Sequence, residues 1–352
     1  MALTPERGIL IVGTFPAGGS PNHGSHPVCA DLASRLAAAG WRVITTSSKS
    51  GRAARLADML GTIVARRREY AAAQVDVFSG LAFVWAEACC LALRRLRKPY
   101  ALTLHGGNLP AFARRHPARV RRLLRSARVV TTPSRYLLEH MRAYREAILP
   151  IPNPLSLPRY PFRLRAPARP ALVWLRAFHR AVYHPGLAVR VAAMLLDDFP
   201  ELQLVMVGPD KDGSRGRVES LAAGLGLNGR LTLPGGVPRA AVPGWLARGD
   251  VFLNTARVDN TPVSVLEAMA CGLCVVSTDV GGIPYLLEHE SDALLVPPDD
   301  AAAMAGAVRR VLADPQLAAR LSRNARRKAE GFDWDALLPR WERLFQEMIA
   351  HG

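Results

Sequence analysis

Short apolar runs alternate with longer amphipathic stretches along the chain. In the first half the apolar runs lie at residues 9–14, 42–46, 75–79, 100–104 and 129–132, and helix-like sequence follows them. The first helix is predicted over His26–Ala39, where Gly40 provides a C-terminal stop. Strands that alternate with helices are typical of βαβ units, so this pattern predicts an α/β domain with a parallel sheet.

A proline-rich segment interrupts this alternation. Four prolines fall within Leu149–Pro158, which is typical of an extended linker. The alternation resumes with apolar runs at 171–175, 202–208, 231–233, 251–253, 274–278 and 294–296, and with helical sequence at 186–196, 218–225 and 262–270. The sequence therefore predicts two Rossmann-like domains that face each other across a cleft. Ligands of such sheets bind beyond the carboxyl ends of the strands.

Composition excludes several classes of protein. The chain has 352 residues, 49% of them hydrophobic and 21% charged, which excludes a disordered or fibrous protein. The number of cysteines is odd, so a disulfide framework is not expected; Cys271 and Cys274 have the spacing of a redox or zinc motif without a second pair, and we expect them to be buried. The start of the chain lacks a leader pattern, and the longest apolar run, residues 81–93, is too short to span a bilayer. A cytoplasmic location is expected, peripheral on the inner face of the plasma membrane.

The positive charge lies almost entirely in the first half. The formal net charge is +17, and residues 1–160 hold 24 basic and 8 acidic residues against 22 and 21 in residues 161–352. This asymmetry points to an anionic partner of the first half, although a general bias toward arginine is an alternative. Residues 112–128 contain Arg121, Arg122, Arg125 and Arg128 around a stripe of Val120, Leu123, Leu124 and Ala127. Such a helix either lies on an anionic membrane or buries its stripe in the core. Without aromatic residues between the basic ones, no nucleic acid is expected.

The segment with the richest chemistry is residues 259–278. Pro262 is favourable at the start of a helix, whose first unpaired N–H groups suit a phosphate or a sugar hydroxyl. Asp259 comes just before this helix, and Glu267 lies about two turns into it, among apolar residues. Burying such an acid is costly unless it binds something, and carboxylates accept hydrogen bonds from paired sugar hydroxyls.

The same segment resembles a known family. Asp259 and Glu267, followed by Ala-Met-Ala-Cys-Gly and by Val-Val-Ser-Thr-Asp-Val-Gly-Gly-Ile, are similar to the motif of the retaining glycosyltransferases of family 4, which have the GT-B fold. The likeness also includes the Gly-rich loop Ala17-Gly18-Gly19, the strand-end His105, Ile151-Pro-Asn153 and Phe332-Asp-Trp-Asp335. It implies an acceptor-binding domain over residues 1–153, a nucleotide-sugar-binding domain over 154–330, and a C-terminal helix over 331–352 that crosses back to the first domain.

The resemblance also implies roles for individual residues. Asp259 would hold donor-sugar hydroxyls, Glu267 the ribose, Arg176 the diphosphate, and His105 would lie beside the donor sugar. Further donor contacts would come from Gly18, Gly19, Asn260, Thr261, Pro262 and Val263, and His23 and His26 flank the first loop. Two departures stand out: Asp259 replaces the usual Glu, and the usual Lys after Arg176 is missing, so that Arg180 or His184 would substitute.

The implied activity is transfer of a sugar with retention, from a UDP-sugar rather than a GDP-sugar, to a saccharide or lipid-linked acceptor in bacterial cell-envelope or polysaccharide synthesis. No cofactor or essential metal is expected, because Asp210-Lys-Asp212 reads as a turn and Asp333-Trp-Asp335 as a helix start. The alternatives are a GT-B-fold nucleotide-sugar epimerase and a non-catalytic homologue that binds sugar or nucleic acid.

Overall fold

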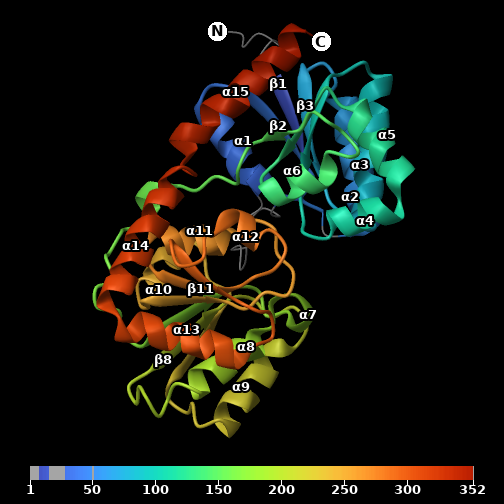
Figure 1. The fold of residues 1–352 in the computed structure, drawn as a ribbon. Coiled ribbons are helices and arrows are strands. Elements are labelled where there is room, and N and C mark those ends of the chain that lie inside the picture. Colours follow the sequence, from blue (N-terminus) through green and yellow to red (C-terminus); the bar gives the residue numbers. More distant parts are fainter. Residues whose placement is uncertain (1–7, 16–27, 50, 352) are drawn as a thin grey trace. The chain divides into compact units, whose positions relative to one another are not determined.

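The computed structural model describes residues 8–15, 28–49 and 51–351, which form two compact units (Figure 1). The first unit contains the described residues up to Pro154 together with Asp335 onwards, and the second contains Leu155–Trp334. Each unit is built around its own parallel sheet.

The sheet of the first unit has the strand order β2-β1-β3-β4-β5-β6. The order reverses between β1 and β3, where Ile11 pairs with Gln74 and Val12 with Val75. Buried side chains from one face of this sheet form a core with helices α2 to α6. The elements are β1 (Gly8–Val12), α1 (Val28–Ala38), β2 (Arg42–Thr46), α2 (Arg52–Ala65), β3 (Ala72–Val77), α3 (Ala82–Arg95), β4 (Tyr100–Leu104), α4 (Leu109–Arg115), α5 (Pro117–Ser126), β5 (Val129–Thr132), α6 (Arg135–Met141), β6 (Leu149–Pro150) and α15 (Trp334–Ala350).

The sheet of the second unit has the order β12-β11-β10-β7-β8-β9, which reverses between β7 and β10. Its strands are apolar on both faces because alternate residues enter two separate cores: Leu172 and Leu253 lie in one, Val173 and Phe252 in the other. The elements are η2 (Leu157–Arg159), β7 (Ala171–Leu175), α7 (Arg180–Tyr183), α8 (Pro185–Ala193), β8 (Gln203–Val207), α9 (Ser214–Gly224), β9 (Leu231–Gly235), η3 (Arg239–Ala241), α10 (Val242–Leu246), β10 (Val251–Asn254), α11 (Val263–Ala270), β11 (Cys274–Thr278), α12 (Ile283–Leu286), β12 (Ala293–Val296), α13 (Ala301–Ala313) and α14 (Pro315–Glu330).

The predicted α/β architecture is confirmed, and most predicted strands begin or end within a few residues of the observed ones. β3 is longer than predicted and begins at Ala72, because it pairs with β1 through the polar but buried Gln74. β6 lies inside the segment that reads as a linker. It forms the last strand of its sheet, where a proline is tolerated because its missing N–H faces away from the ladder.

Helix α15 packs on the first unit although it follows the second in sequence. The indole of Trp41 donates to Glu342 Oε1 at 2.9 Å, and the Trp41 ring meets Phe345 edge-on. Phe345 also stacks on Trp341 within the helix. This apolar face holds the C-terminal helix against the first unit.

Helix α5 contains the apolar stripe that the sequence leaves either on a membrane or in the core. Val120, Leu123 and Leu124 are buried, so the apolar stripe lies in the core, while Arg121, Arg122, Arg125 and Arg128 are exposed. The exposed surface of α5 is therefore mainly basic and not apolar. None of the described helices is long and apolar enough to cross a membrane.

Candidate active site

The reversal between β7 and β10 brings two predicted site residues together. Arg176 follows β7, and Asp259 lies in the loop after β10, so both stand at the carboxyl edge of the sheet. The guanidinium of Arg176 forms an ion pair with Asp259 Oδ2 and lies 4.8 Å from the centre of the Tyr183 ring. The sequence places these residues more than eighty positions apart, and the sheet topology joins them.

Asp259 is a carboxylate whose side chain is 11% exposed and has few compensating contacts. Its Oδ1 accepts the Asn260 N–H at 2.9 Å, and Arg176 contacts its other oxygen. Burial raises the pKa of Asp259, while the charge of Arg176 opposes that rise. Within the described part of the chain, the buried Nε of Arg176 has no hydrogen-bond partner. Arg176 therefore keeps one N–H donor for an anionic ligand.

Two glycines fix the loop that carries Asp259. A Cβ on Gly281 would lie 2.2 Å from the Asp259 carbonyl oxygen, and one on Gly282 would lie 2.0 Å from that of Asn260. Gly282 also donates its N–H to the Asp259 carbonyl at 3.1 Å. Only glycine allows this close approach of two backbones, so Gly281 and Gly282 hold the backbone of Asp259 and Asn260 in place.

The predicted donor-binding stretch forms the N-terminal end of α11. Pro262 has an extended backbone, so the helix begins at Val263. Asn260 and Thr261, which precede Pro262, are buried. Ser264, in the first turn, was not predicted as a site residue. Its buried hydroxyl has no partner among the described residues. A serine in a first helical turn is too common for sequence reasoning to select it.

Glu267 is buried on α11, as its neighbours on that helix are. Its Oε1 accepts the hydroxyl of Tyr160 at 2.6 Å. Burial and the adjacent Glu267 raise the pKa of Tyr160, so this hydroxyl stays protonated and donates. Tyr160 lies in the proline-rich segment, where no periodicity identifies it.

Arg180 and His184 line a cavity of about 290 Å³ between α8 and α9, together with Pro185, Gly186, Arg190, Ser214, Arg217, Val218 and Leu221. His184 Nδ1 contacts Asp299 Oδ1 at 2.7 Å, and Asp299 also accepts from Arg257. Burial lowers the pKa of His184, so its imidazole is mainly neutral at pH 7. Of the two predicted substitutes for the missing lysine, only Arg180 therefore brings a positive charge.

His105 belongs to the first unit and follows β4. Its Nε2 contacts Asp76 Oδ1 at 3.0 Å, and its ring stacks on Phe78 with centroids 5.0 Å apart. Gln74 Nε2 donates to the same Asp76 oxygen at 2.7 Å. Sequence reasoning missed Asp76, although an acid inside an apolar strand was a visible signal.

The remaining predicted residues divide into three groups. Gly18, Gly19, His23 and His26 lie outside the described residues. Asp212 closes a turn by accepting from Ser214 N, and Asp333 accepts from Leu157 N, so each binds backbone. Cys271 and Cys274 are buried as predicted, and burial raises their pKa to about 11 and about 12, which leaves both as unreactive thiols.

Comparison with known proteins gives consistent matches. The model described as Glycosyltransferase Family 4 matches residues 23–159, and the one described as Glycosyl transferases group 1 matches residues 175–328. D-inositol 3-phosphate glycosyltransferase of Streptomyces avermitilis is 28% identical over 270 residues, which are 71% of this chain and 58% of that protein. The chain thus matches little more than half the length of this relative.

Two solved structures resemble the whole chain. Sucrose-phosphate synthase of Thermosynechococcus elongatus has a TM-score of 0.79 at 21% identity, over 98% of this chain and 100% of that one. Anabaena HepE in complex with UDP-glucose has a TM-score of 0.71 at 17% identity, over 98% and 100%. At these identities the likeness concerns the fold. With two family models that match most of the chain and this fold, the chain belongs to glycosyltransferase family 4 and has the GT-B fold.

Proposed function

We propose that this protein is a retaining glycosyltransferase that moves a sugar from a UDP-sugar to a saccharide or lipid-linked acceptor. The observation that carries the proposal is the cluster of Arg176, Asp259 and the start of α11 at the reversal between β7 and β10. Buried polar atoms without partners among the described residues, Arg176 Nε and Ser264 Oγ, are groups that a polar ligand satisfies. The UDP-glucose complex of HepE, which shares the fold, supports the choice of a UDP-sugar over a GDP-sugar.

In this proposal each residue has one task. Arg176 donates to the diphosphate and stabilises the charge that develops on it as the bond from the anomeric carbon to the phosphate oxygen breaks. The acceptor hydroxyl attacks the same face of that carbon, and its proton passes to the leaving diphosphate oxygen. Asp259 holds hydroxyls of the transferred sugar, and Glu267 accepts from the ribose.

The proposal is tested with a panel of UDP- and GDP-sugars, by measuring released UDP or GDP with and without saccharide and lipid-linked acceptors. Glu267→Ala is expected to lower release about 100-fold, the usual order for one well-placed polar group. Glu219→Ala is the matched control, because Glu219 is an exposed acid on α9 paired with Arg215. It should release nucleotide like the wild type.

Each outcome decides between the candidate functions. No release and no saturable binding of any donor contradicts a transferase. Interconversion of the donor sugar without an acceptor identifies an epimerase instead. Saturable binding without turnover identifies a non-catalytic homologue. If Glu267→Ala releases nucleotide as fast as the wild type, the assignment of Glu267 to the site is rejected and the transferase activity stands.

We further propose that the first unit docks reversibly on an anionic membrane, which supplies a lipid-linked acceptor. The exposed arginines of α5 support this, at roughly 1 kcal/mol for each cation near anionic lipid. Combined replacement of Arg121, Arg122 and Arg125 by Ala should weaken binding to vesicles that contain phosphatidylglycerol. Replacing the exposed Arg320, Arg323 and Arg327 of α14 removes the same charge and serves as the control. Equal binding to phosphatidylcholine vesicles rejects the idea.

A further inference from the structure

The Glu267 carboxylate has a buried hydrogen-bond partner, Tyr160, which comes from a segment outside α11. Tyr160 is 2% exposed, and its hydroxyl donates to Glu267 Oε1 at 2.6 Å. A phenol has one proton to donate, and this one goes to the carboxylate. The bond occupies one acceptor position of Glu267 and is charge-assisted, so it restricts the rotation of the carboxylate.

The backbone next to Tyr160 is fastened to the end of α11. Arg326 donates both to the Tyr160 carbonyl at 3.1 Å and to the Ala270 carbonyl at 2.8 Å. Two residues on, Phe162 lies against Gly272, where a Cβ would come within 2.6 Å of its ring. Residues 160–169, called the strap below, therefore follow α11 from Glu267 toward the start of β11.

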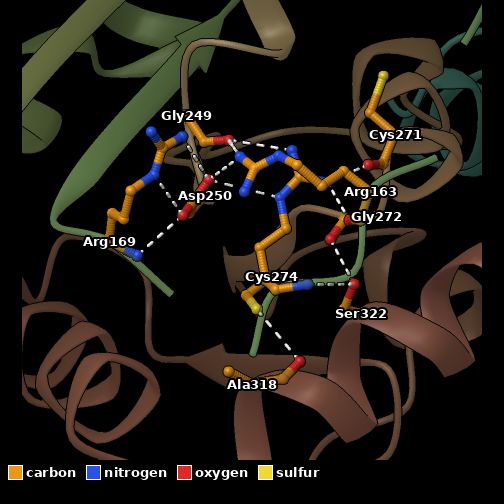
Figure 2. Close-up of polar contacts among 10 residues, drawn as sticks. Arg163, Arg169, Gly249, Asp250, Cys271, Gly272, Cys274, Ala318 and Ser322 are labelled. Atoms are coloured by element: carbon orange, nitrogen blue, oxygen red, sulfur yellow. Dashed lines mark hydrogen bonds and ion pairs between the residues drawn. The ribbon is translucent and has the colours of Figure 1, made fainter. Parts of the chain in front are cut away.

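The far end of the strap is anchored on a buried carboxylate (Figure 2). Arg163 and Arg169 form ion pairs with Asp250, whose side chain is fully buried just before β10. Arg165 is buried as well and donates to the Gly249 carbonyl at 3.1 Å and to the Cys271 carbonyl. These bonds hold the strap independently of Glu267. The position of Tyr160 is thus set by the fold rather than by the contact it makes.

We propose that Tyr160 is a positioning residue for nucleoside recognition: it orients the Glu267 carboxylate to receive both hydroxyls of a ribose at once. This rests on the proposed function, in which Glu267 binds the ribose. A carboxylate held in one orientation binds a vicinal diol tightly, and the affinity falls when either hydroxyl is missing. A carboxylate free to rotate adapts to a single hydroxyl and discriminates less.

The test is the binding of UDP and 2′-deoxy-UDP to the full chain by isothermal titration calorimetry. Tyr160→Phe removes only the hydroxyl and keeps the ring in its core. UDP affinity is expected to fall about tenfold, and the preference for UDP over 2′-deoxy-UDP to fall about threefold. Tyr100→Phe is the matched control, because it removes a hydroxyl bonded to Ser126 at 2.8 Å in the first unit. It should leave both affinities unchanged.

Other outcomes overturn the proposal, and they separate it from the proposed function. If the wild type prefers UDP and Tyr160→Phe keeps that preference in full, Tyr160 does not position Glu267, while the proposed function stands. If the variant loses affinity for both nucleotides equally, Tyr160 is merely structural. If the wild type binds neither UDP nor GDP, the proposed function fails and the inference fails with it.

Discussion

Two aspartates flank the same strand of the second unit, and their surroundings shift their pKa values in opposite directions. Asp250 comes just before β10, and Asp259 lies in the loop after it. Burial acts to raise the pKa of Asp250, but hydrogen bonds from Arg169 and Arg163 and the charge of Arg163 together lower it to about 2. Asp259 has Arg176 beside it and a pKa that burial raises. The surroundings of Asp250 thus favour its charged form, and burial of Asp259 disfavours the charged form.

The difference separates an anchor from a site. Asp250 accepts the backbone N–H of Arg169 at 2.8 Å as well as its guanidinium, and Arg163 and Arg165 complete its surroundings. At Asp259 the contacts are one arginine and one backbone N–H. A carboxylate held by several arginines stabilises the fold, whereas one with a single arginine partner is available to a ligand.

The largest expected effect comes from neutralising Asp259. Asp259→Asn should lower glycosyl transfer about 1000-fold, because the carboxylate no longer holds the donor sugar or orients Arg176. Its free energy of unfolding should fall by no more than about 1 kcal/mol, because the guanidinium of Arg176 that loses its counter-charge is 15% exposed and is still reached by water. Turnover assays and denaturant titration measure the two quantities.

Asp198→Asn is the control for this change, because Asp198 is an exposed partner of Arg309. It should alter neither quantity. If Asp259→Asn unfolds readily but turns over normally, Asp259 is an anchor like Asp250, and the contrast between the two ends of β10 disappears.

These two ends also differ in how far sequence predicts them. Asp259, Glu267 and the glycines around residue 281 lie in one contiguous segment, so a helix start and an unusual acid are visible together. Asp250 pairs with arginines about eighty residues away in the strap, which has no periodicity. The sheet and the proximity of Asp259 to the start of α11 were therefore predictable. The strap and Tyr160 were not, because their roles depend on tertiary contacts.

The second largest effect is expected at the anchor. Asp250→Asn leaves the buried Arg165 without its counter-charge, so the free energy of unfolding should fall by about 3 kcal/mol. Turnover per folded molecule should stay within about twofold of the wild type. The site lies at the other edge of the sheet, and Arg165 and Arg326 still hold the strap through bonds to backbone carbonyls. A stable Asp250→Asn protein with no activity would reverse the assignment of anchor and site.

Low pH should decrease the free energy of unfolding of the wild type, because Asp250 becomes protonated. The pKa of Asp250 is about 2 in the folded chain against 3.8 without these contacts. Its contribution is therefore complete above about pH 5 and is lost as the pH falls through 3.8 toward 2, an effect of about 2 kcal/mol. Denaturant titrations between pH 5 and pH 2 should show the difference between wild type and Asp250→Asn shrinking across that window. A constant difference would contradict the assigned ionisation.

The smallest effect is expected for Arg163→Ala. Its guanidinium pairs with Asp250 but is 45% exposed, and Arg165 and Arg169 remain to hold the carboxylate. An exposed and redundant ion pair contributes little, so the free energy of unfolding should fall by about 0.5 kcal/mol. In Asp250→Asn the same Arg163→Ala change should cost still less or nothing, because the pair it breaks is already gone. A double-mutant cycle measures this coupling. A loss above about 2 kcal/mol in the single variant would mean that the three arginines act as one unit, and that the anchor is less redundant than its contacts indicate.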